Sequence, residues 1–158
     1  MKRTFMTKEL EYVNSKKLET ISGLSNLSKS LMDNINECDP DDRKVHGQKR
    51  IDTICKKLKI PTVKLNVSEC PQLHRDTTRG TLKQKTLGTY CHIGDRPISI
   101  TIYNLTAKTQ KIVSGKTFFH TILHEVCHHI DCAKLGFASS PHTTGFYKRI
   151  SYLASCFN

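Results

Sequence analysis

The strongest constraint on the fold is the segment from Thr117 to Leu135, TFFHTILHEVCHHIDCAKL, which is rich in apolar residues and contains neither proline nor glycine. A run of this length and composition predicts one long helix. Gly136 follows directly, in the position where helices commonly end on a left-handed residue. After the turn at Ser140-Pro141, apolar residues recur at helical spacing and predict a last amphipathic helix through Phe146, Ile150, Leu153 and Phe157.

Strand signals lie upstream of this helix. The segment 98–103, ISITIY, places three isoleucines on one face and polar or aromatic residues on the other. Together with LGTYCHI at 87–93 and the turn GDRP at 94–97, it predicts a β-hairpin. Residues 63–67, VKLNV, alternate as a half-buried strand does, whereas the polar and basic residues 68–86 predict a surface loop or ribbon.

The N-terminal third reads as helical. Between Thr7 and Glu37 apolar residues recur at helical spacings, which predicts one long helix or two shorter ones. The run CDPDD at 38–42 marks a break, and a further helix is expected from Asp42 to Leu58. The whole order predicts an α+β fold, with an N-terminal helical arm at residues 1–40 and a single domain at residues 41–158.

Length and composition favour a water-soluble domain. The 158 residues are 37% hydrophobic and 25% charged, which suffices for one compact core and excludes collagen-like or wholly disordered chains. The chain contains no run of about 18 apolar residues that would span a membrane, and its polar start lacks the apolar run of a secretory signal. We therefore expect a cytoplasmic protein without a membrane partner.

The charge is strongly basic and unevenly distributed. Lys and Arg number 25 against 14 Asp and Glu, a formal net charge of +11, and residues 43–85 hold 12 of the basic and 3 of the acidic side chains. Such an excess favours polyanions and indicates DNA or a DNA-associated location, the alternative being a solvated face. The candidate nucleic-acid contacts are Arg43, Lys44, Lys49, Arg50, Arg75, Arg79, Lys83 and Lys85.

The predicted long helix contains the pattern HExxH at His124, Glu125 and His128. Residues four apart are separated by about 40° around a helix axis and one turn along it, so both imidazoles can reach one ion. Zinc is the natural candidate, and the neighbouring Glu125 can reach a water molecule beside it. A histidine-rich helix without metal is the alternative.

A catalytic zinc usually has three protein ligands, so a third is needed. Asp131 lies almost on the same helix face, but its short side chain is better suited to bond a ligand imidazole or to be an ordinary polar residue of that face. His129 points elsewhere, and His120 could border the site or pack in the core. His142 can return to the metal from the loop after Gly136, although spacing alone equally allows a surface turn histidine.

The stretches TILHEVCHHID and PHTTGFYKRI resemble the SprT-like zinc metallopeptidases, which include the Spartan proteases that degrade proteins crosslinked to DNA. The resemblance implies His124, His128 and His142 as ligands of one zinc ion per chain, Glu125 as the catalytic glutamate and Phe146 as a packing aromatic. It also implies a zincin-like domain with a small antiparallel or mixed sheet packed on the HExxH helix. Thr143 stands where the family often has glycine, and this chain lacks the cysteine-rich zinc ribbon that many members add, so the resemblance does not extend to the mode of DNA engagement.

This combination predicts a zinc metalloendopeptidase that hydrolyses peptide bonds through a zinc-activated water, with Glu125 as the general base. Asp131, Tyr103 and Tyr147 are candidates for supporting a ligand or the transition state. An extended protein or peptide substrate is expected to pair with the strand at 98–103, taken as a sheet edge. The alternative is a basic nucleic-acid-binding protein in which zinc only stabilises the fold.

Overall fold

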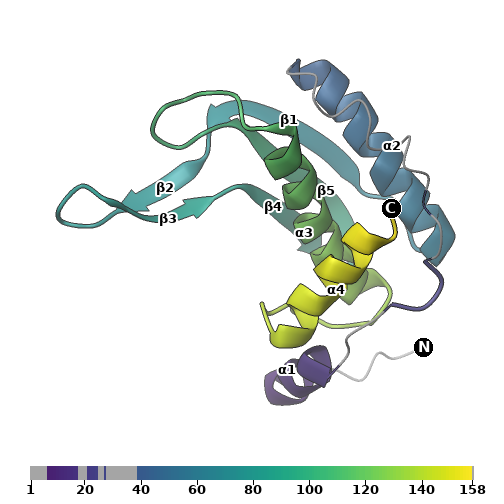
Figure 1. The fold of residues 1–158 in the computed structure, drawn as a ribbon. Helices are drawn as coiled ribbons and strands as arrows, with labels where there is room; N and C mark the ends of the chain where they lie inside the picture. Colours follow the sequence, from purple (N-terminus) through teal and green to yellow (C-terminus); the bar gives the residue numbers. More distant parts are fainter. Residues whose placement is uncertain (1–6, 18–20, 25–26, 28–38, 158) are drawn as a thin grey trace.

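The computed structural model describes residues 7–17, 21–24, 27 and 39–157, and these form an α+β fold with a small mixed sheet (Figure 1). This confirms the predicted general class. The elements in chain order are α1 (Lys8–Lys17), α2 (Pro40–Leu58), β1 (Lys64–Pro71), β2 (Leu73–Asp76), β3 (Leu82–Thr86), β4 (Gly88–Ile93), β5 (Arg96–Leu105), α3 (Gly115–Ala133) and α4 (Thr144–Ser155).

Within the described part of the N-terminal helical pattern, α1 is the helix, and there the Thr7 hydroxyl accepts from the Leu10 N–H. A turn at residues 22–23, with Gly23 at φ +96°, excludes one continuous helix through this region. The rest of the pattern, up to Glu37, lies largely outside the described residues. α2 starts at Pro40, two residues before the predicted Asp42, because the Asp39 side chain caps it by accepting from the backbone N–H groups of Asp41 and Asp42.

The sheet has the strand order β1-β5-β4, with β1 parallel and β4 antiparallel to β5. The predicted hairpin is therefore present as β4 and β5. The expectation that the strand at 98–103 is an edge is wrong, because β1 occupies its other side and takes up its backbone groups. The edges of this sheet are β1 and β4.

Helices α2 and α3 cover one face of the sheet. Leu65 of β1 and Ile100 and Ile102 of β5 point toward them and are fully buried. Close packing requires a glycine at position 47 of α2, because a Cβ atom there would lie 2.5 Å from Leu65 Cδ2. The opposite face carries the alternate side chains of β5, including Tyr103.

Residues 73–86, hereafter the basic arm, form the ribbon of β2 and β3 and the turn between them. The two strands pair antiparallel and project from the sheet, away from α2 and α4 (Figure 1). Almost every side chain of the arm is exposed, which confirms the predicted surface ribbon over residues 73–86. Residues 68–71, which were predicted to belong to it, instead continue β1. Lys108 braces it by donating to the Gly80 carbonyl (2.6 Å) and pairing with Asp76 (3.3 Å).

The helix with the HExxH pattern is α3, and its central residues are buried against the sheet and α4. Both of its ends lie two residues before the predicted ones, at Gly115 and Ala133. It starts at Gly115 because the Ser114 hydroxyl caps it by accepting from the Thr117 N–H at 3.1 Å. Gly136 adopts φ +76°, as its position predicted. Among the described residues, no helix combines the length and the apolar character needed to cross a membrane.

Candidate metal centre

Three histidines converge on one point, two from α3 and one from the loop before α4. The Nε2 atom of His142 lies 3.1 Å from Nε2 of His124 and 3.0 Å from Nε2 of His128. His124 and His128 meet because they stand one turn apart on α3, and His142 joins them because the loop after Gly136 folds back over this helix. Among the described residues, these three form the group able to hold a metal ion, with donor atoms within 4.8 Å of one another.

The donor set fits zinc. Three imidazole nitrogens bound at about 2.05 Å in a tetrahedral arrangement would lie roughly 3.3 Å apart, close to the two spacings above. A neutral imidazole carries a proton on one of its two ring nitrogens, and the other nitrogen has a lone pair. Three clustered nitrogens cannot all be paired by hydrogen bonds, so some lone pairs face one another. A cation between the three atoms satisfies all of these lone pairs at once.

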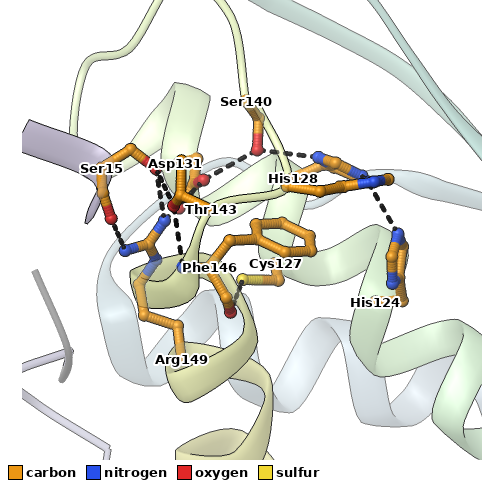
Figure 2. Close-up of polar contacts among 10 residues, drawn as sticks. Ser15, His124, Cys127, His128, Asp131, Ser140, Thr143, Phe146 and Arg149 are labelled. Carbon is orange, nitrogen blue, oxygen red and sulfur yellow. Dashed lines mark hydrogen bonds and ion pairs between the residues drawn. The ribbon is translucent and has the colours of Figure 1, made fainter. Parts of the chain in front are cut away.

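The orientation of His128 is set by a chain of polar contacts that Figure 2 shows. The Ser140 hydroxyl donates to Asp131 Oδ2 at 2.7 Å, so its oxygen is left to accept from Nδ1–H of His128, also at 2.7 Å. With the proton on Nδ1, the Nε2 atom keeps its lone pair for a metal.

Asp131 is the buried anchor of this chain. Its side chain is fully buried and pairs with the equally buried guanidinium of Arg149 from α4, with 2.9 Å between Oδ2 and the nearer nitrogen (Figure 2). Of the two roles that the sequence left open, Asp131 takes the supporting one, but through Ser140 rather than by a direct bond to an imidazole. Ser140 and Arg149 were not predicted. The sequence could have indicated a buried role for Arg149, because it shares the apolar face of α4 with Phe146 and Leu153.

Burial keeps His124 and His128 neutral. It lowers the pKa of His124 to about 4, with the neighbouring His142 adding to the shift. It lowers the pKa of His128 to about 3, with His124 and His142 adding to it. A metal ligand must be the neutral imidazole, so this environment favours the form that binds.

Phe146 closes the inner side of the site, as the family resemblance implied. Its ring is fully buried, and its centroid lies 4.6 Å from that of His128, 5.0 Å from that of His142 and 5.1 Å from that of His124. The aromatic ring therefore limits the movement of all three imidazoles and keeps water from their inner side.

Glu125 lies beside the three histidines on the same cleft. The backbone N–H of Tyr90 in β4 donates to its carboxylate, while burial raises its pKa to about 7. The side chain is only 5% exposed, and the carboxyl is held between α3 and the edge of the sheet. A carboxyl group with a pKa near neutrality can both accept and return a proton.

The cleft has a volume of about 850 Å³ and runs between β4, the base of the basic arm, α3 and the start of α4. Tyr147 lines it, half exposed, with its ring centroid 6.0 Å from that of His142. His120 lines its far end, which agrees with the bordering role considered for it. Tyr103 is on the sheet face opposite the helices and does not line the cleft, so its candidacy for the site is wrong.

Of the eight residues predicted to contact nucleic acid, two are buried and six are exposed. Arg43 and Arg50 are each 1% exposed and stack over Phe118 and Phe119, so their prediction as nucleic-acid contacts is wrong. They occur on the inner face of α2, where their stems and guanidinium planes pack. The other six candidates are exposed: Lys44, Lys49, Arg75, Arg79, Lys83 and Lys85.

His129, which the sequence pointed away from the metal, has a structural role. It is fully buried, and its Nε2–H donates to the Pro61 carbonyl at 2.7 Å while Nδ1 accepts from the Tyr90 hydroxyl at 3.1 Å. This neutral histidine joins α3 to the sheet and to the connection after α2.

No protein-family profile, curated protein or solved structure matches this chain. The function is therefore inferred from the geometry of the site and from the residues that form it.

Proposed function

We propose that this protein is a zinc metallopeptidase of the SprT-like, zincin type. The observation that carries the proposal is the convergence of three imidazoles, two of them kept neutral by burial, with a carboxyl group of near-neutral pKa in one open cleft. His124, His128 and His142 would hold the ion, and its chemistry when bound would be to polarise the scissile carbonyl and to acidify water.

Glu125 is the general base in this proposal. Its carboxylate takes a proton from the attacking water and then delivers it to the leaving amine of the peptide bond. The bond from the Tyr90 N–H restrains the carboxylate where Glu125 lines the cleft. Tyr147 is the candidate donor to the oxyanion, because it is the tyrosine that both lines the cleft and flanks His142.

The substrate would lie along β4 and not along β5. Tyr103 N–H donates to the Leu87 carbonyl at 3.0 Å, and because antiparallel pairing alternates, the backbone groups of Gly88 and Tyr90 point away from β5. Both residues line the cleft. The Tyr90 N–H already donates to Glu125, so an extended peptide would pair with the Tyr90 carbonyl and the backbone groups of Gly88, which brings its backbone past Glu125.

The second candidate function is that of a nucleic-acid-binding protein with a structural zinc site. The exposed lysines and arginines of the basic arm favour it, and Lys85 belongs both to the arm and to the cleft. However, structural zinc sites are closed by four protein ligands, whereas the described residues supply three, and His142 is exposed to the cleft. We therefore propose that the arm brings DNA-associated proteins to a peptidase site.

The test compares wild-type protein with Glu125→Gln, using Glu69→Gln as a matched exposed control. Zinc content and cleavage of an unfolded protein substrate are measured with and without single-stranded DNA. We expect about one zinc per chain in all three proteins and a loss of cleavage of at least a hundredfold in Glu125→Gln alone. Cleavage by Glu125→Gln at the wild-type rate would refute the peptidase proposal, and bound zinc without any cleavage would favour the structural alternative.

A further inference from the structure

Helix α1 contacts the loop that carries the third histidine. The carboxylate of Glu11 is 3% exposed, and both of its oxygens accept hydrogen bonds from this loop. Oε1 accepts from the backbone N–H of Ala138 at 2.8 Å, and Oε2 accepts from the Ser139 hydroxyl at 3.0 Å. These two donors directly precede Ser140 and lie within four residues of His142.

A second contact from α1 reaches the other end of the loop. Ser15 is fully buried, and its hydroxyl lies 3.0 Å from that of Thr143, the residue after His142 and the cap of α4. Arg149 donates to both the carbonyl and the hydroxyl of Ser15, at 2.9 and 3.1 Å (Figure 2). The same guanidinium holds Asp131, so Ser15 is joined to the polar chain that ends on His128.

The loop depends on these polar contacts because it buries little apolar surface. Phe137 is its buried hydrophobic side chain, whereas Ala138, Ser139 and His142 are exposed. Hydrogen bonds to a charged group are stronger than those between neutral groups, and a buried carboxylate is strongly destabilised when its donors are removed. Glu11 therefore holds the loop in one position with respect to α3.

We propose that α1 is a clamp for the metal site, in which Glu11 and Ser15 are positioning residues for His142 and for the Ser140–His128 contact. This inference rests on the metal site of the proposed function, and it makes the N-terminal helix part of that site. Because coupling between two binding events is reciprocal, zinc binding must in turn hold α1 more tightly on the loop.

The test measures zinc affinity by chelator competition in the full-length chain. Glu11→Ala is compared with Glu9→Ala, an exposed glutamate of the same helix, and with Glu11→Gln. The glutamine oxygen can still accept from the Ala138 N–H, whereas its NH2 group can only donate to the Ser139 hydroxyl. Removing a group that hydrogen-bonds a metal ligand costs about 10–100-fold in metal affinity. We expect zinc affinity to fall about tenfold in Glu11→Ala, to fall less in Glu11→Gln and to stay unchanged in Glu9→Ala. The visible spectrum of bound Co²⁺ should shift in Glu11→Ala, which reports on the coordination geometry.

A second measurement uses the wild-type chain, so it does not depend on any variant folding. Amide hydrogen exchange of residues 8–17 is followed in metal-free and zinc-loaded protein, and we expect slower exchange with zinc. Two results would overturn the clamp and leave the peptidase proposal in place: equal zinc affinity in Glu11→Ala and Glu9→Ala, or the same amide exchange rate in α1 with and without zinc. If the wild-type protein cleaves no substrate but zinc still slows exchange in α1 and Glu11→Ala still weakens zinc binding, the peptidase proposal is refuted and the clamp is not.

Discussion

The hydroxyl oxygen of Ser140 lies 2.7 Å from Nδ1 of His128 and donates its own proton to Asp131. A single serine thus decides which nitrogen of a candidate metal ligand carries the proton. The same loop places His142 against the other two imidazoles, so the positions of Ser140 and His142 are coupled through the backbone between them.

Ser140→Ala should weaken zinc binding without unfolding the protein. The variant removes the acceptor for His128 Nδ1–H, and such losses cost about 10–100-fold in metal affinity. Chelator competition measures the change, with Ser151→Ala, an exposed serine of α4, as the control. Unchanged affinity in Ser140→Ala would mean that the tautomer of His128 is set in another way.

His142→Ala should lose most of the zinc affinity, because two imidazoles alone leave the ion with too few protein ligands. The exposed His74 of the basic arm offers a matched control as His74→Ala. Metal content after dialysis against a weak chelator is the measurement. If His142→Ala retains one zinc per chain as firmly as His74→Ala, the third ligand is not His142.

The metal-free protein should become less stable as the pH falls below about 6.5. Burial lowers the pKa of His124, His128 and His129 from 6.5, so below this pH the unfolded chain binds their protons and the folded chain does not. Glu125 acts in the opposite sense, because its raised pKa of about 7 lets the folded chain bind a proton between pH 7 and 4.5. Asp131 acts in the same sense as Glu125, because burial raises its pKa. Three groups outweigh two by about one proton, so the free energy of unfolding should fall by about 1 kcal/mol per pH unit.

Urea denaturation at pH 7.5, 6.5 and 5.5 measures this slope. Glu125→Gln removes one of the two opposing groups and should steepen the slope, which makes that variant the internal control. A free energy of unfolding that is constant or rises between pH 6.5 and 5.5 would contradict the neutral, buried state of these histidines.

Reversing charge on the basic arm should weaken DNA binding and leave zinc binding intact. Arg75→Glu with Lys83→Glu removes two exposed cations from residues that do not line the cleft, so we expect lower affinity and a shallower dependence on salt concentration. Lys56→Glu with Lys57→Glu on α2 is the matched control outside the arm. Equal effects of both pairs would show that the arm is only part of a general basic surface.

Local patterns in the sequence predict the helices from Pro40 onward, the hairpin and the two clustered histidines of the HExxH pattern. His124, Glu125 and His128 lie within five residues, and a helix brings them together by its own geometry. The same holds for the alternation that buries Ile100 and Ile102 beneath the helices. Spacing alone left His142 undecided, and the family resemblance was needed to single it out.

What only the tertiary structure decided is the pairing of distant segments. The position of β5 between β1 and β4 moved the free edge to β4, and the inward packing of Arg43 and Arg50 removed them from the predicted DNA surface. The links from Glu11 to Ala138 and from Arg149 to Asp131 join α1, α3 and α4, and each depends on where the chain returns in space. Helical and strand periods are set by neighbouring residues, whereas burial and long-range hydrogen bonds are set by the packing of the whole domain, which no local spacing contains.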